Sequence, residues 1–177
     1  MMPSDVKVNG CYLVAIVAIV TLAASGFGIA LVTVGELNET YALRLDWNET
    51  QKEDNETYLT SASAAGLMIG SLLSSSIVKM GRRRAILLGS LIQLVGAAAQ
   101  FFTHFWVLFA GKVVYGAASA IMLTGSALYL SETLPQDKIN SHGFAVNLGV
   151  TVGISVVLLL GAFVSKDDKD SASWLMV

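Results

Sequence analysis

Two polar features of this chain lie where an apolar environment would make them chemically important. Lys112 is the only charged residue within any of the stretches that are otherwise uncharged and long enough to cross a membrane. Burying its ammonium group is costly, which makes Lys112 a candidate for function, although its long side chain could also reach the outer membrane surface. Asn147, Thr151 and Ile154 form a stripe on one helix face, at positions i, i+4 and i+7. The Asn147 amide needs a hydrogen-bond partner there, either on another helix or in a polar ligand.

The other reactive residues do not suggest an enzyme. His104 and His142 are expected at opposite membrane faces, so they cannot share a metal ion. The sequence has no Cys-x-x-Cys pair, phosphate loop or Ser-His-Asp pattern, and Cys11 is its only cysteine, either inert or palmitoylated. We therefore expect no catalytic site, no metal, no cofactor and no nucleic-acid partner.

Composition predicts an all-α membrane protein. Hydrophobic residues make up 54% of the chain and charged residues 14%, against about 25% charged residues in soluble domains. A stretch of about 20 apolar residues spans a hydrocarbon core of about 30 Å. The pattern predicts five transmembrane helices, over residues 11–34, 58–79, 84–103, 106–131 and 140–164, with a sixth that begins near residue 174. The first apolar stretch is too long for a signal peptide.

Charge asymmetry predicts the orientation of the helices. The turn Lys79–Arg84 carries four positive charges, whereas the loop 35–57 carries seven acidic and two basic residues. Basic residues in short loops stay on the cytoplasmic side. The N-terminus and the basic turn are therefore expected inside, and the loop 35–57 outside.

Three glycosylation sequons fall in that outer loop. They begin at Asn38, Asn48 and Asn55, and each continues Glu-Thr. Together they indicate a glycoprotein of the secretory pathway, with the plasma membrane as its expected location. The alternative is an acidic, solvated loop without sugar.

Small residues recur at helical spacing in the predicted spans. Gly66 and Gly70 form one Gly-x-x-x-Gly pair, and Gly149 and Gly153 form another. In lipid, small residues at i and i+4 let helices approach closely. The pairs indicate either static bundle packing or surfaces that slide during a conformational change.

Four motifs resemble those of the sugar porters of the major facilitator superfamily. They are Gly81-Arg82-Arg83 after the second helix, Gly111-Lys112-Val-Val-Tyr-Gly116 in the fourth, Tyr129-Leu-Ser-Glu132-Thr-Leu-Pro135 at its end, and Asn147-Leu-Gly149-Val-Thr-Val-Gly153-Ile154 in the fifth. The resemblance covers about residues 12–177 in the right order and spacing. The Tyr-x-x-Glu-x-x-Pro motif is its most specific part.

The resemblance implies twelve helices in two halves, with residues 1–177 forming most of the N-terminal half. Trp174–Val177 looks like the first turn of a sixth helix, so we expect a fragment of a longer protein. A hexose-like sugar would bind at the midplane, contacted by Asn147, Thr151, Ile154 and Phe27. The expected partners are this sugar, the lipid bilayer and the C-terminal half of the chain.

The resemblance also implies gating or structural roles for a second set of residues. Arg82 or Arg83 can pair with Glu132, because the loops that carry them are expected at the same membrane face. Such a pair would have to break during alternating access. The full set is Gly81, Arg82, Arg83, Lys112, Glu132 and Pro135.

Several positions depart from the family pattern. Val78 replaces an acidic or amide residue, Ser74 replaces a glycine, and Ile139-Asn140 replaces an Arg-Gly pair. Ala30 stands where proton-coupled members carry an acid that pairs with the arginine matched by Lys112. Without that carboxylate, facilitated uniport is favoured over proton symport.

Two other functions stay open. One is transport of another small polar solute on the same fold, because a fold does not fix its substrate. The other is a truncated, non-transporting membrane protein that acts as an assembly or signalling partner.

The orientation can be tested by labelling. With Cys11→Ser as background, Met80→Cys should react with a thiol reagent only after the cells are made permeable, because the basic turn is expected inside. Labelling of that residue from outside intact cells would reverse the predicted topology.

Overall fold

The computed structural model describes residues 10–45, 47–102, 104–134 and 143–163, and within these ranges the regular structure is α-helical throughout. The helices are α1 (Gly10–Arg44), α2 (Glu49–Lys79), α3 (Arg82–Ala99), α4 (Phe105–Thr133) and α6 (Ala145–Phe163). The predicted all-α class is confirmed. The predicted start of a sixth span near residue 174 lies outside the described residues.

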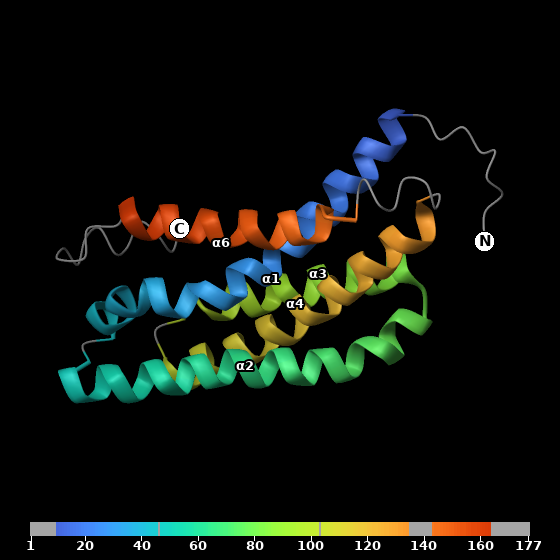
Figure 1. The fold of residues 1–177 in the computed structure, drawn as a ribbon. Coiled ribbons are helices and arrows are strands. Elements are labelled where there is room, and N and C mark those ends of the chain that lie inside the picture. The colour runs from blue at the N-terminus through green and yellow to red at the C-terminus, as the bar shows by residue number, and fades with distance from the viewer. Residues whose placement is uncertain (1–9, 46, 103, 135–142, 164–177) are drawn as a thin grey trace.

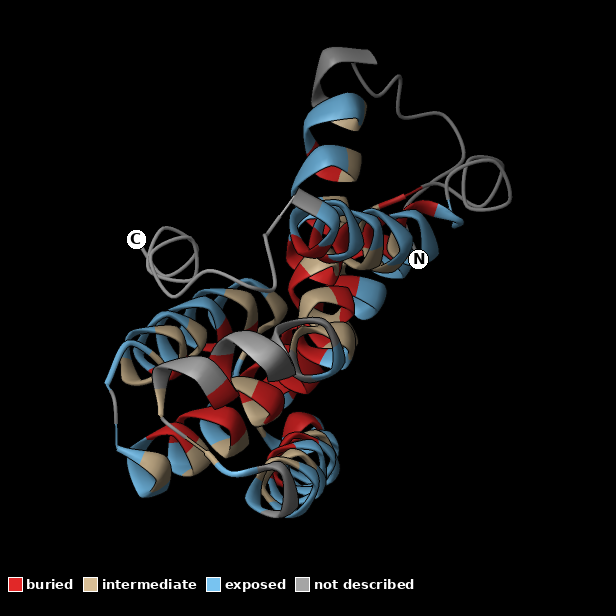
Figure 2. Ribbon diagram, turned by 90° about the vertical axis from the view of Figure 1, so that its left-hand side faces the viewer, coloured by how far each residue is buried: buried red, intermediate tan, exposed pale blue. Residues whose placement is uncertain are grey.

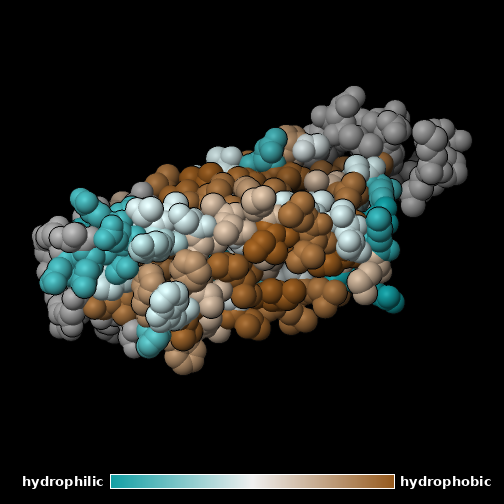
Figure 3. All heavy atoms as spheres, turned by 90° about the horizontal axis from the view of Figure 1, so that it is seen from below, coloured by the Kyte–Doolittle hydropathy of each residue, from teal (hydrophilic) through white to brown (hydrophobic). Residues whose placement is uncertain are grey.

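Four of these helices contain a segment long and apolar enough to cross a membrane. The segments are Leu13–Thr33, Gln51–Lys79, Phe105–Thr133 and Ala145–Ala162. The surface carries the matching pattern, since a broad apolar band separates hydrophilic ends (Figure 3). These four helices are thus long and apolar enough to cross a membrane, as the composition predicted.

The third expected span is shorter than predicted. α3 has 18 residues and ends at Ala99 rather than near residue 103, and three arginines occupy its first turn. The helix is followed by a turn, in which the backbone N–H of Gln100 donates to the carbonyl of Ala97 at 3.0 Å and that of Phe101 to the carbonyl of Ala98 at 3.2 Å. By length and composition α3 therefore does not qualify as a span on its own, although it packs along α4.

The prediction that residues 35–57 form a loop is wrong, because most of these residues are helical. α1 continues to Arg44 and α2 already begins at Glu49. The extension is anchored by Tyr41, which is buried with Leu59 of α2 and Leu108 of α4. This burial stabilises helical turns that the charge pattern alone assigns to a solvated loop.

The helices pack in two groups that meet along α1 and α4. α1 packs mainly on α6, whereas α4 lies between α2 and α3 and also contacts α1 (Figure 1). Buried residues concentrate where the helices face one another, and the outer sides are exposed (Figure 2). The interior therefore consists of the interfaces between neighbouring helices.

The closest backbone contacts between helices occur at glycines. A Cβ on Gly149 or Gly153 would collide with backbone atoms of Thr21 or Ser25 in α1. On the other side of the bundle, Gly70 lies directly against the backbone of Ala117, where its Cβ would be 2.6 Å from the Ala117 Cα. Such contacts are available only to residues without a side chain. The small residues seen in the sequence are thus packed at helix crossings.

Two apolar clusters close the ends of the bundle. One joins the early part of α1 to the end of α4 and the start of α6, through Ile16, Val20, Leu130, Leu134 and Ala145. The other joins α1, α2 and α4 through Tyr41, Leu59 and Leu108, with Leu45, Trp47, Phe105 and Phe109 packed around it. The Trp47 and Phe105 rings meet edge to face at 6.2 Å between centroids.

Replacing a packed glycine should destabilise the bundle. Gly70→Ala should lower stability by about 1–3 kcal/mol, because the added methyl group must push α2 away from α4. The matched control is Gly35→Ala, where nothing lies within 4 Å of the new Cβ. That change should be neutral or stabilising by up to about 1 kcal/mol, since alanine favours helix. Equal thermal unfolding of the two variants in detergent would contradict the packing.

Candidate functional site

The polar stripe on α6 points away from the packed face of that helix. Gly149 and Gly153 face α1, whereas Asn147 and Thr151 are exposed and Ile154 is half-buried. The Thr151 hydroxyl donates to the backbone carbonyl of Asn147 at 2.9 Å. Within the described residues, the Asn147 side chain makes no hydrogen bond to another helix.

Phe27 lies on α1, beside the helix that carries the stripe. It is half-buried, and the following residue, Gly28, lies against the backbone of Val150 and Ile154. The structure thus brings Ile154 next to the Phe27 segment. Asn147 and Thr151 lie on the side of α6 that turns away from α1.

Lys112 is buried, and its ammonium group is directed at an aromatic ring rather than at solvent. Its side chain is 3% exposed, and its Nζ lies 5.4 Å from the centroid of the Tyr41 ring, which is itself 4% exposed. An ammonium group over an aromatic face is attracted by the negative charge density of the ring. Tyr41 was missed by sequence reasoning because it falls in the segment assigned to a loop.

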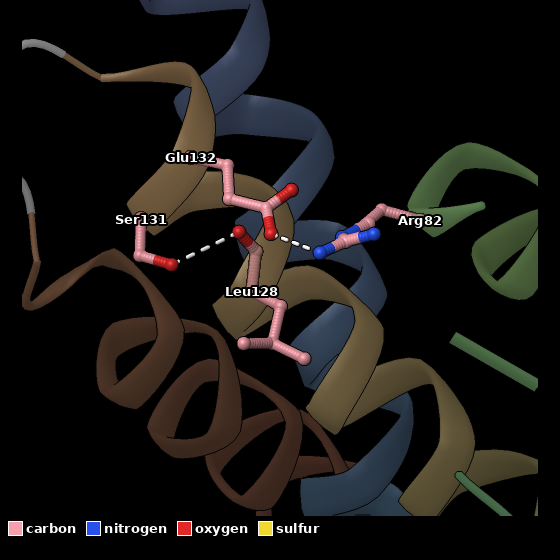
Figure 4. Close-up of polar contacts among 4 residues, drawn as sticks. All are labelled: Arg82, Leu128, Ser131 and Glu132. Atoms are coloured by element: carbon pink, nitrogen blue, oxygen red, sulfur yellow. Dashed lines mark hydrogen bonds and ion pairs between the residues drawn. The ribbon is translucent and has the colours of Figure 1, made fainter. Parts of the chain in front are cut away.

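The predicted ion pair at the basic turn is present. A terminal guanidinium nitrogen of Arg82 donates to a carboxylate oxygen of Glu132, joining the start of α3 to the end of α4 (Figure 4). The two side chains are 39% and 47% exposed, so water reaches the pair. Arg83 is exposed beside it. The geometry thus selects Arg82 from the two candidates that the sequence offered.

Gly81 gives the basic turn its shape. Its φ of +123° is a conformation that residues with a side chain rarely adopt. The turn follows the last residues of α2, where Val78 and Ser74 are 5% and 4% exposed. The Ser74 hydroxyl donates to the carbonyl of Ser71 at 2.6 Å, within its own helix. Val78 and Ser74, which depart from the family pattern, therefore add no polar group to the Arg82–Glu132 pair. Pro135, Ile139 and Asn140 lie outside the described residues.

Ala30 lines a cleft of about 440 Å³ between α1 and α2. The walls are mostly apolar and the polar groups come from α2, with Glu56, Thr60 and Ser63 among the lining residues. Among the described residues, no group of three His, Cys, Asp or Glu side chains could hold a metal ion.

The three sequons differ in their backbone context. Asn38 lies within α1 and Asn55 within α2, whereas Asn48 directly precedes α2 in the short connection between them. Its backbone N–H donates to the Gln51 side chain at 3.3 Å, and the residue is exposed. A glycosylation acceptor needs an accessible loop, so Asn48 is the best placed of the three.

Known proteins are similar to this chain over much of its length. The family described as "Sugar (and other) transporter" matches residues 14–177. Sugar transport protein 1 of Arabidopsis thaliana is 31% identical over 112 residues, which cover 62% of this chain and 22% of that protein. Hexose transporter 1 of Plasmodium yoelii yoelii is 24% identical over 156 residues, covering 84% and 31% respectively.

A vertebrate relative gives a similar result. The solute carrier family 2, facilitated glucose transporter member 10 of Xenopus tropicalis is 34% identical over 112 residues, covering 60% of this chain and 20% of the relative. The chain therefore spans less than a third of the length of the relatives that it matches. It is an integral membrane protein rather than an enzyme, and it belongs to the sugar transporter family.

Proposed function

We propose that this chain forms most of the N-terminal half of a plasma-membrane carrier that moves a hexose-like sugar by alternating access, as a uniport. The observation that carries the proposal is the exposed amide of Asn147 on an otherwise apolar helix. A sugar is neutral and rich in hydroxyl groups. Its site therefore needs hydrogen-bonding amides and hydroxyls in an apolar wall rather than charges.

The uniport mechanism rests on the region around Lys112 and Ala30. A proton relay needs a group that gains and loses a proton near neutral pH, usually a carboxylate beside the cation. Ala30 offers no such group at its position in α1, where the carboxylate lining the same cleft is that of Glu56 on α2, and the Lys112 ammonium lies over the ring of Tyr41. Both features favour transport that does not depend on a proton gradient.

The proposed gate is the Arg82–Glu132 pair. Arg82 lies at the N-terminal, positive end of α3, and Glu132 lies at the C-terminal, negative end of α4. Each charge is unfavourable for its own helix dipole, and pairing offsets this cost. Exposed ion pairs contribute only about 0.2–1 kcal/mol, so the contact is weak enough to break in every transport cycle.

Sugar uptake tests the proposed substrate and its site. The full-length protein that contains this chain should take up radiolabelled hexose when it is expressed in transporter-deficient cells. Asn147→Leu should lower the apparent affinity about tenfold, because an unpaired substrate hydroxyl costs about 1–3 kcal/mol. Asn147→Gln keeps an amide and should retain more of the affinity.

Uptake should be unchanged by a protonophore. Accumulation that collapses with the protonophore would overturn the uniport mechanism. Absence of any hexose uptake, with normal surface expression, would redirect the search to other small polar solutes or to a non-transporting role.

The gate is tested by a pair of arginine substitutions that remove the same charge. Arg82→Gln should shift the carrier toward the inward-open state by up to about 1 kcal/mol, or about fivefold in the ratio of the two states, because it removes the partner of Glu132. Arg83→Gln should have a smaller effect. Thiol accessibility at the two membrane faces reports the shift, and equal responses of the two variants would exclude the pair as the gate.

A further inference from the structure

A chain of hydrogen bonds crosses the middle of the bundle and ends on α1. The Gln93 side chain of α3 donates from Nε2 to the hydroxyl of Ser119 on α4 at 3.2 Å. The Ser119 oxygen lies 3.4 Å from the carbonyl of Gly26 on α1. Ser119 is fully buried. This polar node therefore joins three helices at one level.

The node contacts α1 at a point where that helix has no side chain. A Cβ on Gly26 would overlap the amide of Gln93, so the amide occupies the space that a side chain would fill. Two residues further on, Gly28 lies against the backbone of Val150 in α6. Successive helix residues are about 100° apart, so Gly26 and Gly28 lie on nearly opposite sides of α1.

Phe27 lies between these two contacts. Its side chain leaves α1 about 100° from each packed glycine, and it is half-buried. Any rotation or shift of α1 relative to α3 and α4 would therefore change the direction of the Phe27 ring. The polar node and the Val150 backbone hold the segment from two sides.

The Ser119 hydroxyl has one hydrogen and two acceptors. Besides the Gly26 carbonyl, the carbonyl of Tyr115 in its own helix lies at 2.9 Å. When the hydrogen points to Tyr115, the hydroxyl is still satisfied and can still accept from Gln93. The contact with α1 can thus be made or released without leaving a buried hydroxyl unpaired.

We propose that Gln93 and Ser119 are positioning residues that set the orientation of Phe27, and through it the affinity for substrate. This role rests on the proposed function, in which Phe27 contacts the transported solute. Gln93 and Ser119 do not touch the solute themselves. They act by fixing the Gly26–Gly28 segment of α1, and the choice of acceptors at Ser119 lets this segment move during the transport cycle.

The position of residue 27 can be measured directly. Phe27→Cys is introduced into a full-length protein from which Cys11 and any other cysteine have been removed, and it is labelled with a small, charged methanethiosulfonate reagent. Gln93→Leu and Ser119→Ala should each change the labelling rate by about threefold or more, in line with the loss of one hydrogen bond. The double variant should match the larger single change, because the two residues act as one unit.

Ser126→Ala is the matched control. Ser126 lies on the same helix and is fully buried like Ser119, and among the described residues its hydroxyl donates to the Leu123 carbonyl of its own helix, at 2.9 Å. This variant should leave the labelling rate unchanged. In the protein with Phe27 intact, Gln93→Leu and Ser119→Ala should raise the apparent KM for hexose about threefold to tenfold with little change in maximal rate.

The outcomes separate the two proposals. Labelling that is unaffected by all variants, or affected equally by Ser126→Ala, overturns the positioning role while the transport proposal stands. A cysteine at position 27 that is not labelled in the parent protein places Phe27 off the aqueous path, which overturns the positioning role; hexose uptake then decides separately whether the transport proposal survives.

Discussion

Direct contact between helix backbones at glycines is the constraint on which this bundle depends. Lipid tails are as apolar as leucine, so burying leucine between helices gives little advantage in a membrane. The attraction between helices then comes mainly from dispersion, which acts over short distances and requires the helix axes to approach closely. Gly149 and Gly153 permit this approach between α1 and α6, and Gly66 and Gly70 permit it between α2 and α4. Many of the large apolar side chains lie on the outer surface instead.

The membrane helices could be predicted from the sequence because local composition determines them. A run of uncharged residues has one stable conformation in hydrocarbon, whatever its neighbours. The pairing of the basic turn with Glu132 was also predictable, since the turn before α3 and the end of α4 must meet at one face. The choice of Arg82 over Arg83 depends on the rotation of α3, which the sequence pattern does not give.

The features that could not be predicted depend on contacts between distant segments. The helical extension through Tyr41 exists because Leu59 and Leu108 bury that ring, and neither residue is near it in sequence. The role of Ser119 is hidden for the same reason. Most hydroxyls in helices bond their own backbone, as Ser126 and Thr124 do here. That the Ser119 hydroxyl also lies near a carbonyl of another helix becomes visible only when α1 and α4 are seen to cross.

The length of α1 has a mechanical consequence. Its 35 residues extend about 52 Å, well beyond a hydrocarbon core of about 30 Å. The turns of α1 after its apolar segment Leu13–Thr33 therefore form an arm beyond that segment, and a tilt of about 10° would displace the tip of a 52 Å helix by about 9 Å. The Trp47 and Phe105 rings fasten this arm to the start of α4. A small tilt of α1 would thus be passed to the start of α4 as a displacement of several ångströms.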